Sequence, residues 1–131
     1  MPSLYIILEK KIPNADIYVN GSFLSKHNDE LGRMAKRLGV RPLMDFFSIS
    51  SEELLSLAEE YGASLNKPKA AHHEIWFAGE EGLRTVKTLL QGLPSSKLDQ
   101  SDRIESELRE FVNVLELAKA NGVRWHLGVD Y

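Results

Sequence analysis

The chain has 131 residues, of which 43% are hydrophobic and none is cysteine. A chain of this length is expected to form one domain, residues 1–131, and to bury roughly two thirds of its unfolded surface, so it can fold without disulfides or a metal. The absence of cysteine excludes a thiol nucleophile and a thiolate zinc site. The net charge of −3, from 16 basic and 19 acidic residues, argues against nucleic acid as a partner, because its binders usually carry a basic field.

The first apolar segment predicts a strand from Leu4 to Glu9, covered on both faces. Its five apolar residues are too few for a secretory core or a membrane span, so we expect a cytoplasmic location and no membrane partner. The residues from 16 to 19 are either a second short strand or a loop before the Asn20-Gly21 turn signal.

Two helices are expected in the next part of the chain. The first begins at Ser22 or Ser25 and ends near Leu38, and its apolar stripe contains His27, for which a hydrogen bond to the backbone is the commoner explanation. Residues 43–47 are either a short strand or an irregular core segment. Ser50 to Glu53 fits a capping box and predicts a helix as far as residue 62, followed by a loop over 63–71.

The second half of the chain predicts two helices and a final strand. One helix begins near Glu80 and gives way to a turn over 92–96, and the other runs from about Ser96 to Asn121, with Gly122 as the left-handed residue at its end. Apolar and polar residues alternate over 123–131, which predicts a strand with Trp125 in the core. The expected fold is α+β: a small sheet that includes the N- and C-terminal strands, packed against about four helices.

The polar face of the final strand is the first candidate site. Arg124, His126 and Asp130 share this face, and Tyr5 and Glu9 of the first strand could lie beside them. A histidine flanked by an arginine and acids can bind an anion or act as a general base. The commoner explanation is a solvated sheet face with cross-strand charge pairs.

A second candidate surface contains His72, His73, Trp76 and Phe77. Adjacent histidines of a strand point to opposite faces and no HExxH spacing occurs, so we expect no metal site. The two aromatic residues either pack on the first turn of the following helix or form an exposed anchor for a partner. No hydrolase, dinucleotide-binding or Walker motif is present, which favours a non-enzymatic protein without a cofactor.

Three stretches carry a resemblance to a known family: Leu4 to Leu8, Trp76 to Leu83, and Leu108 to Leu127. They resemble small uncharacterised bacterial domains of the YfbM-like type, in which a long terminal helix also leads through a glycine into a final strand. The resemblance covers about a third of the chain and rests on unspecific motifs. It implies a bacterial cytosolic protein with no established activity and no catalytic residues that could be transferred.

Two hypotheses about function follow from these observations. The first is a non-enzymatic protein-binding or accessory protein, such as an immunity protein, that docks on another protein as a monomer or homodimer. The alternative is a domain that binds a small molecule or anion, with or without catalysis, on the polar face of the C-terminal strand.

Overall fold

The computed structural model describes residues 2–15, 17–49 and 74–130. The expected helix after Ser50, the loop over 63–71, His72, His73 and Tyr131 therefore lie outside the described residues. The elements follow the order β1 (Ser3–Leu8), α1 (Ser22–Lys26), α2 (Asn28–Arg37), the 3₁₀ helix η1 (Leu43–Phe46), α4 (Gly79–Ser96), α5 (Ser101–Ala120) and β2 (Trp125–Asp130).

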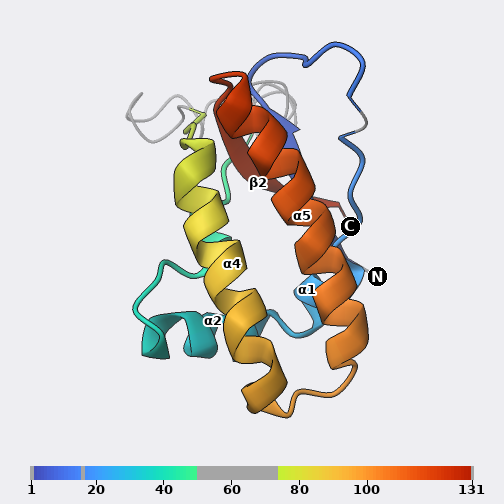
Figure 1. Cartoon of the computed structure of the whole chain (residues 1–131), viewed down its shortest axis with the longest axis vertical. Helices are drawn as coiled ribbons and strands as arrows, with labels where there is room; N and C mark the ends of the chain where they lie inside the picture. The colour runs from blue at the N-terminus through green and yellow to red at the C-terminus, as the bar shows by residue number, and fades with distance from the viewer. Residues whose placement is uncertain (1, 16, 50–73, 131) are drawn as a thin grey trace, which may run out of the picture.

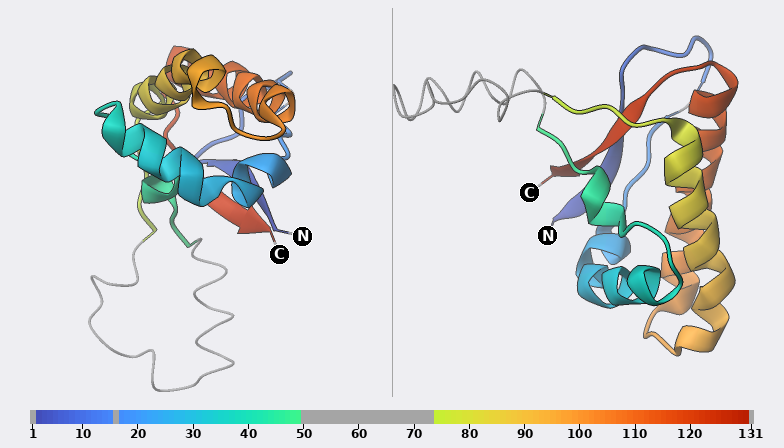
Figure 2. Two further views of the ribbon diagram at one scale, coloured as in Figure 1. Left: turned by 90° about the horizontal axis from the view of Figure 1, so that it is seen from below. Right: turned by 90° about the vertical axis from the view of Figure 1, so that its left-hand side faces the viewer.

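The two strands come from opposite ends of the chain and pair antiparallel, with Ser3 opposite Asp130 and Leu8 opposite Trp125. The two chain ends therefore lie next to each other (Figure 1). Helices α4 and α5 form an antiparallel pair in one layer, and the sheet lies with α1 and α2 in the other (Figure 2). The predicted α+β fold, with a small sheet of the terminal strands and about four helices, is confirmed for the described part of the chain.

Trp125 anchors the sheet to the helices. Its side chain is fully buried and stacks on Phe46 with ring centroids 5.0 Å apart. Its indole N–H donates to the carbonyl of Ala78 over 3.1 Å. The ring packs so closely on α4 that a Cβ at Gly82 would lie 2.3 Å from Trp125 Cζ2. The prediction that Trp125 belongs to the core is confirmed.

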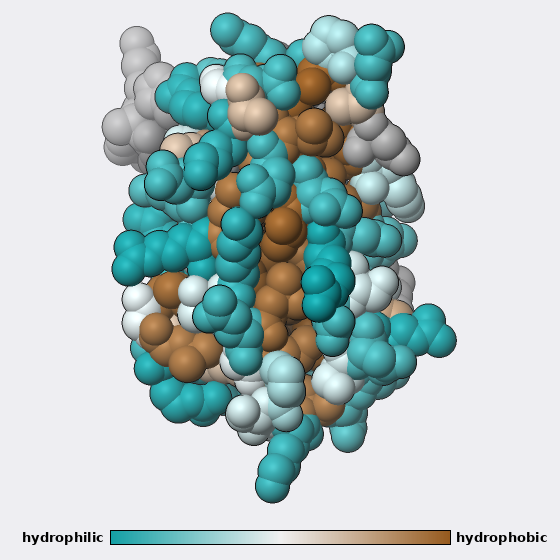
Figure 3. All heavy atoms as spheres, viewed as in Figure 1, coloured by the Kyte–Doolittle hydropathy of each residue, from teal (hydrophilic) through white to brown (hydrophobic). Residues whose placement is uncertain are grey.

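The helix pair differs from expectation at its turn. Helix α4 continues through Pro94 to Ser96, where a turn over 92–96 was expected, and α5 begins at Ser101 instead of near Ser96. The chain reverses its direction between α4 and α5. Lys97 and Gln100 in this turn have left-handed backbone conformations, with φ of 57° and 59°. Apolar side chains fill the seam between the two helices on their outer side, flanked by polar ones (Figure 3).

The helix expected over 22–38 is divided in two. His27 separates α1 from α2 with φ −103° and ψ 20°. Its ring is not bonded to the backbone as expected, because Nδ1 lies 3.1 Å from Glu30 Oε1 and Nε2 lies 3.1 Å from Gln100 Oε1. Gly39 ends this region in the left-handed conformation with φ 80°, where a helix end was predicted.

Helix α1 receives its N-terminal cap from another helix. Glu107 of α5 accepts the backbone N–H groups of Phe23 (3.2 Å) and Leu24 (2.9 Å), and the Asn20 side chain accepts that of Ser22 (3.1 Å), because the N-cap residue Gly21 has no side chain to do so. Burial raises the pKa of the Glu107 carboxyl above its ordinary value of 4.5, against the opposing effect of these hydrogen bonds. The contact fixes α1, and with it the segment that leads to it from β1, against the helix pair. Within the described residues, no helix is both long and apolar enough to cross a membrane.

Candidate functional site

The structure separates the five residues predicted on the polar sheet face into three groups. Arg124 and Glu9 lie together at one end, and His126 is buried in the middle. Tyr5 and Asp130 lie at the other end, where both line one groove. The predicted set therefore does not converge on a single site.

Arg124 and Glu9 form a two-point ion pair across the strands. The guanidinium Nε and Nη2 donate to the two carboxylate oxygens over 3.1 and 2.5 Å. This bond is the main reason why the pKa of Glu9 is lowered from 4.5. The pair matches the cross-strand charge pairs that were the commoner explanation of this face. Because Nε and Nη2 of the Arg124 guanidinium already donate to Glu9, these two donors are not available to an anion.

The middle of the face is covered by a segment from elsewhere in the chain. Phe77 lies beside β2 and exchanges backbone hydrogen bonds with Trp125 over 2.8 and 2.9 Å. Because side chains of an extended segment alternate, Phe77 shares the core face with Trp125, while Trp76 lies on the face of His126. Phe77 packs edge-on against Phe46 with ring centroids 5.0 Å apart, so it joins the core beside β2.

His126 is fully buried, and the expectation that the ionic face turns towards solvent is wrong at this residue. Its Nε2 lies 2.6 Å from Glu74 Oε2 and its Nδ1 lies 3.0 Å from the carbonyl of Leu127. The Trp76 ring covers the imidazole with centroids 4.7 Å apart. Both ring nitrogens therefore face oxygen acceptors, and no side of the ring is open to a substrate.

The described residues contain no group of three or more histidine, aspartate or glutamate side chains that could hold a metal ion. Two of the residues for which a metal was considered, His72 and His73, lie outside the described part. His126 is engaged by Glu74, and His27 by Glu30 and Gln100.

Tyr5 lies where Gly128 leaves room for it. The two residues are opposite each other in the sheet, and a Cβ at position 128 would lie 2.6 Å from Tyr5 Cζ. The tyrosine ring therefore covers the glycine of the neighbouring strand, which restricts where the ring can lie. This fixed ring is one wall of the groove.

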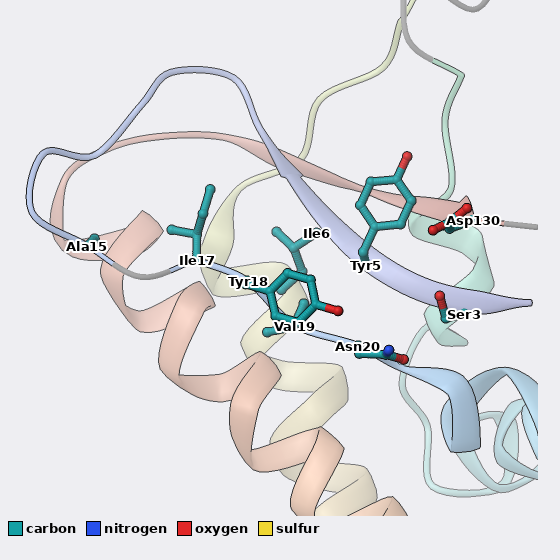
Figure 4. A pocket seen from close by; sticks show the side chains of 9 residues that line it. All are labelled: Ser3, Tyr5, Ile6, Ala15, Ile17, Tyr18, Val19, Asn20 and Asp130. Atoms are coloured by element: carbon teal, nitrogen blue, oxygen red, sulfur yellow. The ribbon is translucent and has the colours of Figure 1, made fainter.

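The groove has a volume of about 770 Å³ and runs along the outer edge of β1 (Figure 4). Its apolar part contains Val19, which is buried, and Ile17, whereas the Tyr18 side chain between them is 77% exposed. Its polar residues gather where β1 begins and β2 ends (Figure 4). The lining residues are Ser3, Tyr5, Ile6, Ala15, Ile17, Tyr18, Val19, Asn20 and Asp130.

Sequence reasoning missed Tyr18 as a candidate residue. The signal was Tyr18 between the apolar residues Ile17 and Val19, in the stretch 16–19 that was interpreted as either a short strand or a loop. Residues 17–20 are not part of a strand, and of this region only Gly21 pairs with β1. The segment therefore runs beside β1 without completing a third strand, and the groove lies between the two.

The outer edge of β1 is paired at Leu4, and its next outward-facing residue, Ile6, is only 5% exposed. Glu9 N–H donates to the Arg124 carbonyl, so by antiparallel alternation the backbone groups of Ile6 point away from β2. On that outer side Leu4 exchanges hydrogen bonds with Gly21 over 3.2 and 2.8 Å. Among the described residues, the backbone ladder on this side ends at that pair, and Ile6 follows it in the groove.

Comparison of the chain with models of protein families, with curated proteins and with solved structures gives no match. The features that bear on function are therefore those of the chain itself. Of these, the groove along β1 is open to a ligand, whereas the His126–Glu74 pair is closed.

Proposed function

We propose that the chain is a non-enzymatic protein-binding domain that takes up an extended segment of a partner protein in the groove along β1. The observation that carries this proposal is Tyr18, a residue that is 77% exposed, beside a groove of about 770 Å³ with apolar residues in its lining. Tyrosine is enriched among the residues that dominate binding energy at protein interfaces. An aromatic side chain that is this exposed in the unbound chain can bury a large apolar surface when a partner binds.

The shape of the groove favours an extended occupant. It follows the edge of a strand, and the outward backbone groups of Ile6 lie along it. Extended peptides bind such edges by adding main-chain hydrogen bonds, while neighbouring pockets receive alternate side chains. Ile17 and Tyr18 then supply an apolar and an aromatic contact to those side chains.

The alternative function, binding of a small anion by Arg124 and His126, has less support. Arg124 already donates two hydrogen bonds to Glu9, and the His126 ring is fully buried. The groove itself has a carboxylate, Asp130, and no lysine or arginine among its lining residues. An anion would therefore meet negative charge there.

A displayed library of random peptides tests the proposal. Peptides are selected on the wild-type chain, and their affinities are then measured for the wild type, Tyr18→Ala and Ile75→Ala. Ile75 is the matched control because it is another exposed apolar residue, at 55%, and is not part of the groove. We expect selected peptides to lose about tenfold or more on Tyr18→Ala and little on Ile75→Ala.

Two results would overturn the proposal. One is a selection that enriches no peptide. The other is a set of peptides that bind Tyr18→Ala as tightly as the wild type. A second copy of the chain in the groove is detected without any peptide, because the amide resonances of Ser3, Tyr18 and Asn20 would then shift with protein concentration.

A further inference from the structure

We infer that the partner segment places a basic side chain, lysine or arginine, at the polar end of this groove, against the Asp130 carboxylate and beside the rings of Tyr5 and Tyr18. The inference rests on the proposed function and adds the chemistry of the partner. It depends on three features of the groove: its charge, its aromatic rings and its apolar residues.

The charge of the lining points to a cation. Asp130 is the only ionisable acid or base, apart from the tyrosines, among the residues described as lining the groove. Ser3 lies directly opposite Asp130 in the sheet, and Asn20 lies near the same end (Figure 4). The Ser3 hydroxyl can accept a hydrogen bond, as the carboxylate does, whereas the Asn20 amide oxygen already accepts the Ser22 N–H over 3.1 Å and keeps one further lone pair. An ammonium or guanidinium group offers several donors and no acceptor.

The aromatic rings favour the same occupant. Tyr5 and Tyr18 contribute their rings to one groove, and the Tyr5 ring is held in place over Gly128. A cation near the face of a tyrosine is attracted by the ring quadrupole, whereas a carboxylate is not. Two rings and one carboxylate in the same groove therefore select for positive charge more strongly than a single exposed aspartate does.

The apolar residues accommodate the rest of such a side chain. Lysine and arginine carry aliphatic stems that pack on apolar surface while the charged group stays near water. Ile17 and Val19 offer that surface within the groove, and Asp130 lies at its exposed end. A basic residue two positions away from an apolar residue in an extended segment matches this order along β1, because both side chains then lie on one face.

Three peptides test the inference by NMR titration of the ¹⁵N-labelled full chain. The first is acetyl-Ile-Thr-Lys-Thr-Ile-amide, in which the lysine and both isoleucines lie on one face of the extended chain, and the other two have norleucine or glutamate in place of the lysine. We expect the lysine peptide to shift the amide resonances of Ser3, Tyr18 and Asn20 and to bind roughly fivefold tighter than the norleucine peptide, with the glutamate peptide weakest. Asp130→Asn should remove most of this preference, whereas Asp99→Asn, in the α4–α5 turn, should keep it.

Equal affinity for all three peptides would contradict the preference for a basic side chain. It would not contradict the proposed binding of a partner segment in the groove. Binding of none of them would also overturn the inference, while the library selection decides the proposed function separately. Butylammonium chloride serves as the last probe. If the free amine shifts the same resonances with the affinity of the lysine peptide, the groove is a site for small amines and a partner segment is not required.

Discussion

The ring of Tyr5 covers Gly128 so closely that a Cβ at position 128 would lie 2.6 Å from Tyr5 Cζ. Because Gly128 of β2 has no side chain, the Tyr5 ring of β1 can lie over it and form one wall of the groove. The same contact links the small sheet to the groove, because Tyr5 belongs to both.

Gly128→Ala should destabilise the chain by about 1–3 kcal/mol, because the new methyl group would lie 2.6 Å from Tyr5 Cζ and 2.9 Å from Ile7 Cδ1 and would displace both side chains. In a Tyr5→Ala background the same substitution should cost much less. Urea unfolding of the wild type, both single variants and the double variant gives the coupling free energy, which we expect to be about 1 kcal/mol. Additive effects of the two substitutions would mean that the ring does not lie over the glycine.

Two glycines of the helices should respond to alanine in opposite directions. Gly82→Ala should lower the free energy of unfolding by about 1–3 kcal/mol, because its Cβ would lie 2.3 Å from the rigid indole of Trp125. Gly32→Ala in α2 has no atom within 4 Å of the added Cβ and should raise stability by about 0.5–1 kcal/mol through helix propensity. Thermal or urea unfolding of the two variants compares them directly, and equal effects would contradict the packing of Trp125 on α4.

Glu107 should make stability depend on pH. Its pKa in the folded chain is raised above 4.5 by burial, so the folded state binds this proton more tightly than the unfolded state does. The resulting stabilisation is complete below the unfolded pKa and is lost as the pH rises through the folded value. Glu107→Gln should lower stability by about 1 kcal/mol through a lost acceptor for the α1 amides, and by a larger amount at pH 4 than at pH 7.

Urea unfolding of the wild type and Glu107→Gln at a series of pH values from 4 to 7 measures this difference. A gap between the two chains that widens as the pH rises would contradict the direction of the shift. A gap of zero at every pH would contradict the capping of α1 by Glu107.

The ion pair at the other end of the sheet can be checked at one carboxyl group. The pKa of Glu9 should lie below 4.5 in the wild type, chiefly because of the hydrogen bond from Arg124, and should rise towards 4.5 in Arg124→Gln. The pKa of Glu116, which Lys87 lowers, is the control and should not change in this variant. Carboxyl ¹³C resonances followed through a pH titration report both groups, and an unchanged Glu9 would contradict the pairing.

Much of the sheet could be predicted from alternation alone. The period of two places Trp125 in the core and Arg124 on the opposite face, and the structure confirms both positions. The period does not say what covers the opposite face. Glu74 and Trp76 come from a distant part of the chain to bury His126, and no local pattern around residue 126 contains that contact.

For a related reason, neither the break in the helix at His27 nor the groove beside β1 could be predicted from the sequence. Leu24 and Leu31 are both buried, so an apolar stripe continues across the break at His27 and gives no sign of it. Ile17 and Val19 alternate with polar neighbours as a strand would, but pairing with β1 is present at Gly21 and does not include them. Whether an extended segment joins a sheet depends on the path of the chain, which alternation does not determine.

The most direct test of the groove is a map of contacts between the labelled chain and a peptide selected on it. The account predicts intermolecular nuclear Overhauser effects from the peptide to the side chains of Tyr18 and Ile17 and to the backbone amide of Ile6. Effects confined to Leu38, Phe47 and Ile75, the exposed large apolar residues outside the groove among those described, would contradict it.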